Sequence, residues 1–113
     1  MLAKPQRLAR DKDFEKIFKQ GKSFFSKLLG VKIILNQRTV NRYGIIVSSK
    51  VSKKAVDRNL LKRQVREAIK RLDSKMAQGI DLAIVVLPAM LGSDFKIIRS
   101  ELENVFAKLK LFK

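Results

Sequence analysis

The pattern of apolar and polar positions predicts a helix most clearly in residues 53–72. Apolar residues recur there at i, i+4, i+7, i+8 and i+11, which on a helix gathers them into one arc roughly 100° wide. The members of this arc are Leu61, Val65, Ala68, Ile69, Leu72 and Met76. The adjoining arc is polar and carries, in order, Lys62, Arg66, Asn59, Lys70 and Arg63, with Arg58 at the entrance of the helix. We therefore expect one face in a core and the next face open.

Two further segments precede this helix. Phe14, Ile17 and Phe18 stand at i, i+3 and i+4 with Gly21 after the last turn, which predicts a short amphipathic helix that Asp11 or Asp13 can cap. Residues 23–35 are rich in Phe, Val, Ile and Leu and predict one bent strand or two short ones, with Gly30 at a bulge or a close approach. Residues 36–42 form a polar loop, and residues 43–49 form a further strand.

The chain after the basic helix predicts one more strand and one more helix. Residues 80–87 are too uniformly apolar to alternate, so we expect a central strand or one covered on both faces, closed by Pro88. Ser93 or Asp94 can cap a last helix. Its apolar positions follow the helical spacing and are Ile98, Leu102, Val105, Phe106, Leu109 and Phe112. This order of elements predicts a layered α+β domain.

The chain has 113 residues, which is enough for one domain with a modest core, so we treat residues 1–113 as a single domain. We expect residues 1–10 to lie extended against the domain or a partner. The N-terminus has no apolar segment of signal-peptide length, and the apolar run at residues 82–87 is far too short to span a membrane. We expect a cytoplasmic protein that does not bind membranes.

The charge changes this picture, because a net charge of +16 and a pI near 10.6 indicate a polyanionic partner. Charged helix faces are usually solvated faces with alternating signs. Residues 50–71, however, contain nine Lys or Arg and only two acids, Asp57 and Glu67. Most of these cations therefore lack a partner on the helix. Arg can donate two parallel hydrogen bonds to a phosphate, Lys supplies a point charge, and Asn59 can donate to a phosphate or ribose oxygen.

The composition also limits catalytic chemistry. The sequence contains no Cys and no His, which excludes thiol nucleophiles, zinc fingers and His acid/base catalysis. The closest group of acids, Asp11, Asp13 and Glu15, stands at the start of an expected helix, where capping and dipole compensation explain it better than metal binding. We expect no catalytic residue and no metal ligand in the protein.

The basic helix also resembles a known motif. Arg58-Asn59-x-x-Lys62-Arg63-x-x-Arg66, preceded by Ala55-Val56, is similar to the RNR motif of the bacterial ribonuclease P protein subunit, and the likeness extends from Phe14 to Asp81. The resemblance implies a two-layer domain in α-β-β-β-α-β-α order, related to the second domain of a small-subunit ribosomal protein. It also implies an unusual left-handed β-α-β crossover and places Asp81 in the fourth strand.

The same resemblance implies a function in tRNA processing. Members of this family belong to a ribonucleoprotein endonuclease that hydrolyses precursor tRNA to remove its 5′ leader, with Mg²⁺ held mainly by the catalytic RNA. The residues implied to bind that RNA are Lys53, Lys54, Arg58, Asn59, Lys62, Arg63, Arg66 and Lys70. The residues implied to line or border a cleft for the single-stranded leader are Phe14, Phe18, Lys32, Ser48 and Lys50. We expect at least one Phe to line this cleft, with the other half-buried beneath it; both could instead be core.

The chain departs from the family pattern at three positions. Lys32 stands where an aromatic residue is frequent, Leu87 where a basic residue is common, and Ser52 where glycine is frequent, which a negative φ would allow. The main alternative function is a structural, ribosomal-type RNA-binding protein. A DNA-binding module is disfavoured because no helix-turn-helix pair precedes the basic helix, and a membrane-surface helix is the weakest alternative.

Overall fold

The computed structural model describes residues 6–8 and 10–113, which form three α-helices and four strands. The helices are α1 (Asp11–Gln20), α2 (Ala55–Leu72) and α3 (Phe95–Lys108). The strands are β1 (Lys22–Phe25), β2 (Leu29–Leu35), β3 (Arg42–Ile46) and β4 (Ile80–Val86). Short 3-10 turns follow α2 at Asp73–Lys75 and β4 at Pro88–Met90. The expected α-β-β-β-α-β-α order is confirmed.

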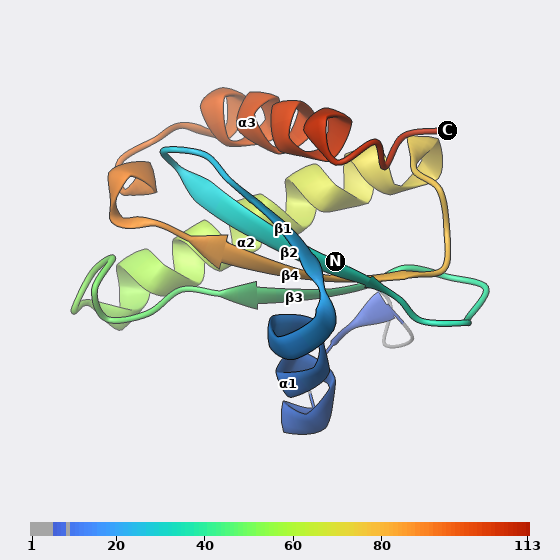
Figure 1. The fold of residues 1–113 in the computed structure, drawn as a ribbon. Coiled ribbons are helices and arrows are strands. Elements are labelled where there is room, and N and C mark those ends of the chain that lie inside the picture. Colours follow the sequence, from blue (N-terminus) through green and yellow to red (C-terminus); the bar gives the residue numbers. More distant parts are fainter. Residues whose placement is uncertain (1–5, 9) are drawn as a thin grey trace.

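The four strands form one mixed sheet in the order β1-β2-β4-β3 (Figure 1). β4 pairs antiparallel with β2 and parallel with β3, so it is a central strand. Six of its seven residues are buried, which confirms the prediction from its uniform apolar run. β1 and β2 are two separate short strands. Gly30 on β2 marks a close approach rather than a bulge, because a Cβ there would lie 2.3 Å from the ring of Phe25.

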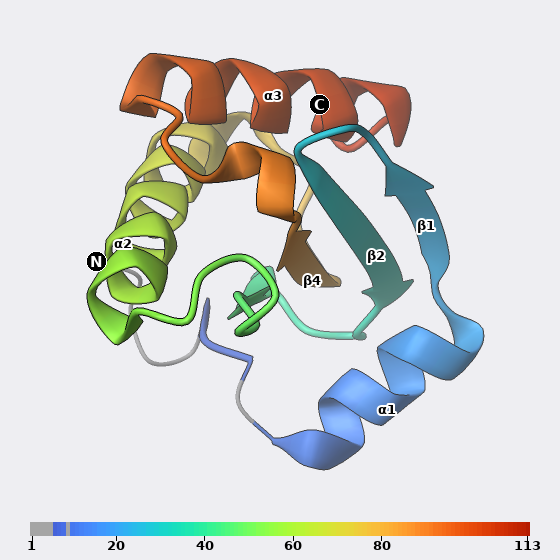
Figure 2. The same cartoon turned by 90° about the vertical axis from the view of Figure 1, so that its left-hand side faces the viewer.

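The parallel pair β3 and β4 is joined by α2 in a left-handed crossover. In Figure 1 both strands point the same way, with β4 above β3, and α2 returns behind the sheet. Figure 2 shows α2 and α1 on opposite sides of the sheet. Left-handed connections are rare in proteins, and the resemblance, rather than packing rules, correctly indicated this one.

The main hydrophobic core lies between one face of the sheet and helices α2 and α3. Leu29 and Val31 of β2 point into this core, together with the apolar arc of α2. The other face is covered by α1, where Ile17 is fully buried against Ala83 and Leu8. The N–H of Leu8 donates to the carbonyl of Tyr43 at 2.9 Å, so this part of the N-terminal segment lies against the domain, at β3. Residues 1–5 and 9 lie outside the described part of the chain.

Several expected helix ends need correction. Helix α1 is preceded by Arg10 at the N-cap, without a side-chain cap, so Asp11 and Asp13 lie inside the first turn. Helix α2 begins at Ala55, two residues later than expected. Helix α3 ends at Lys108 because the chain turns there, which places Leu109 and Phe112 beyond it. Among the expected caps, Asp94 is correct, since its side chain accepts a hydrogen bond from the N–H of Ile97 at 2.9 Å.

Candidate nucleic-acid interface

Helix α2 is held in place by its apolar arc, as its spacing predicts. No glycine or proline interrupts residues 55–72, so nothing in the sequence breaks the helix. The buried residues are at most 3% exposed and are Leu61, Val65, Ala68, Ile69 and Leu72. Met76 is also buried, but it lies beyond the helix after the 3-10 turn. With this face fixed in the core, the adjoining face has a defined orientation at the surface.

The loop before α2 is held by Ser52 and Arg58. The Ser52 hydroxyl accepts a hydrogen bond from the Lys54 N–H at 3.1 Å and donates to the Asp57 carboxylate at 2.8 Å. Arg58 Nη1 donates to the Ser52 carbonyl at 2.8 Å. Ser52 is not among the described residues with positive φ, so the replacement of a frequent glycine causes no strain here. Arg58 is half-buried and positions the loop, a role that the sequence did not suggest because its acceptor is a backbone carbonyl.

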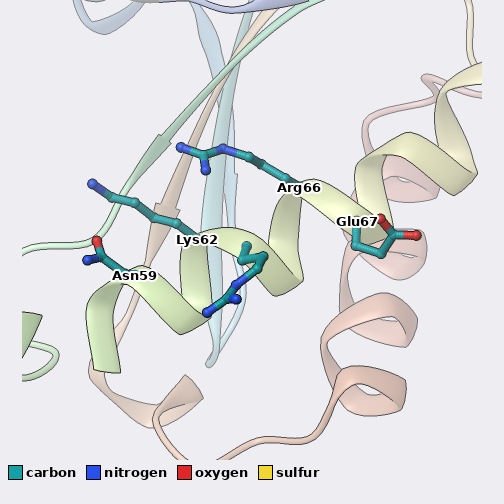
Figure 3. A pocket seen from close by; sticks show the side chains of 5 residues that line it. Asn59, Lys62, Arg66 and Glu67 are labelled. Atoms are coloured by element: carbon teal, nitrogen blue, oxygen red, sulfur yellow. The ribbon is translucent and has the colours of Figure 1, made fainter. Parts of the chain in front are cut away.

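The basic face of α2 borders a hollow of about 370 Å³ (Figure 3). In Figure 3 the side chains of Lys62 and Arg66 extend from the same side of the helix, with Asn59 about one turn before Lys62, whereas Glu67 points away from them. The complete lining is Asn59, Lys62, Arg63, Arg66 and Glu67. Four residues that the sequence assigned to RNA binding therefore share one concave surface.

Most of the positive charges on α2 and the loop before it are not neutralised by carboxylates. Within residues 50–71, all of which the structure describes, the ion pair is that between Arg71 and Glu67 at 3.4 Å. The other acid, Asp57, accepts the hydrogen bond from Ser52. The cations without a carboxylate partner are Lys50, Lys53, Lys54, Arg58, Lys62, Arg63, Arg66 and Lys70. Like charges spaced four residues apart on a helix repel by a few tenths of a kcal/mol per pair, and a bound polyanion would remove that repulsion.

A second hollow, of about 460 Å³, lies beside α1. Phe14 and Phe18 contribute its aromatic surface, and Ile46 at the end of β3 contributes an apolar one. Phe18 is 42% exposed, whereas Phe14 is half-buried. The ring of Phe14 covers Gly44, where a Cβ would approach it to 2.4 Å. This arrangement matches the expected geometry of one open Phe and one half-buried Phe; whether the hollow binds a leader stays a prediction.

The other residues assigned to the cleft are placed differently. Lys32 lies on β2, and its Nζ is 5.1 Å from the centre of the Phe18 ring, so the lysine interacts with the open aromatic face as a cation. Ser48 and Lys50 are exposed in the loop after β3 and are not part of the lining of the hollow. The rim next to Phe18 instead carries charges of both signs, from Asp11, Glu15 and Lys19.

A buried ion pair joins the strands beneath α1. Arg42 on β3 donates two hydrogen bonds to Asp81 on β4, from Nε at 2.8 Å and from Nη2 at 2.6 Å. Asn36 also donates to Asp81, at 2.8 Å, and Arg42 Nη1 reaches Asp13 of α1 at 3.4 Å. The hydrogen bond with Asp81 raises the pKa of Arg42, although partial burial opposes this effect. The sequence placed Asp81 in its strand but did not suggest its partner, which lies 39 residues earlier.

A second polar group is buried in the main core. The Tyr43 hydroxyl donates to Asp73 after α2 and accepts a hydrogen bond from Asn41. Asn41 is fully buried and is satisfied by donating to the Ala77 carbonyl and accepting from the Ile80 N–H, both at 2.8 Å. Burial, and then the hydrogen bond to Asp73, raises the pKa of Tyr43. These groups connect β3 to the end of α2 and stabilise the orientation of the helix.

Two classes of site are not found in the described part of the chain. None of its helices is both long enough and apolar enough to cross a bilayer. No three of its acidic side chains come together in an arrangement that could hold a metal ion.

The fold and the charge pattern together define a class of protein, namely a basic α+β domain with a left-handed crossover and an unpaired cationic helix face. A family model described as Ribonuclease P matches residues 2–110. A ribonuclease P protein component of Pseudanabaena sp. is 35% identical over 112 residues, which cover 98% of this chain and 97% of the relative. The chain belongs to the ribonuclease P protein family.

Solved structures agree with this assignment. A Staphylococcus aureus RNase P protein is 29% identical, with a TM-score of 0.88 over 96% of this chain and 98% of that protein. The RNase P protein of Thermotoga maritima is 33% identical, with a TM-score of 0.83 over 90% of this chain and 96% of that protein. The fold expected from the resemblance is thereby confirmed, and family membership implies an RNA partner.

Proposed function

We propose that this chain is the protein subunit of ribonuclease P, a ribonucleoprotein endoribonuclease that removes the 5′ leader of precursor tRNA. The observation that supports this most strongly is the face of α2, where cations without carboxylate partners stand in the spacing of the family's motif. Free cations on a rigid helix suit an RNA backbone, whose phosphates replace the counterions that otherwise screen them.

In this proposal α2 and the loop before it bind the catalytic RNA. Lys62 and Arg66 extend from the same side of the helix, so they can contact neighbouring phosphates without rearrangement of the backbone (Figure 3). Asn59, one turn earlier, supplies an amide for a phosphate or a ribose hydroxyl. Arg58 contributes indirectly, because its hydrogen bond to Ser52 holds the loop that carries the exposed Lys53 and Lys54.

The hollow beside α1 is proposed to receive the leader. Phe18 offers an open ring face on which an unpaired base can stack, and Phe14 supports the apolar floor. Lys32 lies against the same ring and can bind a leader phosphate when a base displaces it. Ser48 and Lys50 belong to the loop that connects β3 to α2. In this proposal they border the leader where it continues from the hollow toward α2.

The proposal assigns catalysis to the RNA. The whole sequence lacks His and Cys, and the carboxylates of the described residues do not fit a Mg²⁺ site. Asp13 of α1 and Asp81 of β4 are both bound by Arg42. We therefore assign Mg²⁺ to the RNA of the holoenzyme, with the protein increasing substrate affinity and screening phosphate repulsion.

Reconstitution tests this proposal. The protein is mixed with a bacterial ribonuclease P RNA and 5′-labelled precursor tRNA at low Mg²⁺, beside arms containing RNA alone and protein alone. We expect 5′ cleavage to be fastest in the complete mixture and undetectable with protein alone. A structural, ribosomal-type RNA-binding protein would bind RNA without accelerating cleavage. Cleavage by RNA-free protein would contradict the assignment of catalysis to the RNA.

A further inference from the structure

The C-terminal segment pairs with the turn after α2. The Ala77 N–H donates to the Leu111 carbonyl at 2.8 Å, and the Lys113 N–H donates to the Lys75 carbonyl at 3.0 Å. Met76 and Phe112 form the antiparallel bridge between these contacts. Figure 1 shows this end of the chain beside the turn that follows α2. The pairing brings together residues from the C-terminal ends of α2 and α3.

Four exposed lysines surround this junction, and no carboxylate pairs with any of them among the described residues. They are Lys75, Lys108, Lys110 and Lys113, here called the C-terminal lysine surface. Lys75 and Lys113 stand directly opposite each other across the bridge, and like charges in such positions destabilise a pair of strands. The nearby Glu103 is engaged by Arg99 at 3.2 Å. The Lys113 Nζ donates a hydrogen bond to the Ser74 carbonyl at 3.3 Å, which holds this ammonium without neutralising its charge.

Lys110 adds a second local cost. Its φ is +58°, in the left-handed region that favours glycine. The turn that requires this φ ends α3, with the Lys110 N–H donating to the Ala107 carbonyl and the Leu111 N–H donating to the Phe106 carbonyl, both at 3.0 Å. A glycine would close the same turn without strain. Lys110 therefore has a backbone conformation that is unfavourable for a residue with a side chain.

Favourable interaction with helix dipoles explains only two of the four lysines of this surface. Lys75 and Lys108 lie in the last turn of their helices, where cations are favourable. Lys110 and Lys113 lie beyond the helices, so dipole compensation does not account for them. A hollow of about 340 Å³ lies at this junction, and its lining is Leu72, Lys75, Glu103, Asn104, Ala107 and Phe112, so Lys75 is the member of the C-terminal lysine surface that borders it. It combines a half-buried aromatic ring, an amide, the cation of Lys75 and the carboxylate of Glu103, whose charge is neutralised by Arg99. An aromatic ring beside cations is typical of surfaces that bind single-stranded nucleic acid.

We propose that the C-terminal lysine surface binds a second segment of RNA, with its lysines on phosphates and Phe112 against a base. This inference rests on the proposed function only in taking RNA as the partner. The 18 residues of α2 span about 27 Å, so the segment is separate from the one at the entrance of α2. Local repulsion and backbone strain are retained here because RNA binding offsets them.

The experiment uses the full chain and a 30-nucleotide oligouridine labelled with fluorescein, with affinity measured by anisotropy over a range of salt concentrations. The test variant replaces Lys75, Lys108, Lys110 and Lys113 by Gln. A matched control replaces four exposed cations elsewhere, Lys22, Lys27, Arg38 and Lys96, by Gln, so both variants lose the same net charge. We expect the test variant to lose about 2 to 3 units of log-log salt slope and the control less than about 1. Equal losses would show a net-charge effect and overturn the proposal.

Two single variants separate binding from folding. Lys110→Gly removes the strain, so we expect its melting temperature to rise while its salt slope falls by about 0.7. Phe112→Leu keeps an apolar side chain against Phe106, and we expect binding about fivefold weaker at fixed salt, with an unchanged slope. Unchanged binding by both variants would overturn the proposal. Because oligouridine is not a ribonuclease P substrate, failure of the reconstitution experiment would leave this result unaffected.

Discussion

Arg42 and Arg66 carry the same guanidinium group in opposite surroundings. The Arg42 side chain is 11% exposed and is neutralised by Asp81 and Asp13 within the sheet. Arg66 lines an open hollow on α2 and has no carboxylate partner. A buried charge must be paired inside the fold, whereas an exposed one is screened by ions that a polyanion can replace. The two regions thus distinguish cations that stabilise the fold from cations that remain available for RNA.

The largest expected effect comes from breaking the buried pair. Asp81→Ala leaves Arg42 buried without its main partner, so we expect the free energy of unfolding to fall by about 3 to 5 kcal/mol, measured by urea denaturation. Arg66→Gln is the matched change at a half-exposed cation without a carboxylate partner and should alter stability by less than about 0.5 kcal/mol. Similar effects of the two substitutions would remove the distinction between the regions.

The exposed region should respond in binding rather than in stability. Replacing Lys62, Arg63 and Arg66 by Gln should reduce the log-log salt slope of binding to ribonuclease P RNA by about 2 to 3 units. Arg58 is left intact because it holds the loop before α2. Binding is measured by fluorescence titration over a range of salt concentrations, beside a control with Lys22, Lys27 and Arg38 replaced by Gln. A slope that stays at the wild-type value would show that this face is turned to solvent in the complex.

The two phenylalanines repeat the contrast on a smaller scale. Phe18→Ala should leave the protein folded and reduce the preference for precursor over mature tRNA by about 1 to 3 kcal/mol, since an open ring face is lost. Phe14→Ala should mainly reduce stability, because its ring covers Gly44, by somewhat less than the about 3 to 5 kcal/mol typical of a fully buried Phe. Thermal unfolding and the ratio of the two tRNA affinities are measured together. Destabilisation by both variants with an intact ratio would assign both rings to the core.

The smallest effect is a dependence on alkaline pH. Burial and the hydrogen bond to Asp73 raise the pKa of Tyr43 above its ordinary value near 10, so the folded state holds this proton more tightly than the unfolded state. The resulting stability is present below about pH 10 and is lost above it, with a slope that rises toward about 1.4 kcal/mol per pH unit. Urea denaturation between pH 8 and pH 11 should show this slope, and Tyr43→Phe should reduce it. An identical slope in that variant would assign the alkaline loss to other groups.

Local patterns in the sequence were sufficient to predict the helices and strands and the basic face of α2. The arc from Leu61 to Leu72 repeats with the helical period, and the cations beside it outnumber the acids, so burial and charge could both be read from spacing. The left-handed crossover was predicted from the resemblance to the family. Packing rules alone would have predicted a right-handed connection. Boundaries were less accurate, since the end of α3 depends on the turn at Lys110, where no glycine signals it.

Contacts between distant residues could not be predicted. The pairing of Arg42 with Asp81 depends on the parallel register of β3 and β4, and no spacing along the chain encodes that register. The same holds for Tyr43 and Asp73, which meet only after α2 has crossed the sheet. Arg58 was assigned to RNA because its motif position suggests it, and its hydrogen bond to a backbone carbonyl leaves no trace in side-chain patterns.

The crossover from β3 through α2 to β4 affects how the two RNA-binding surfaces are positioned relative to each other. It places α2 on one face of the sheet while α1 lies on the other (Figure 2). Under the proposed function, the leader binds beside α1 and the catalytic RNA binds α2. The thickness of the sheet and core between these two helices therefore sets the distance between the two RNAs. A variant with both surfaces intact but a thicker core would still hold both RNAs and would present the scissile bond out of register. Its defect would appear in the choice of cleavage position while its affinities stayed normal.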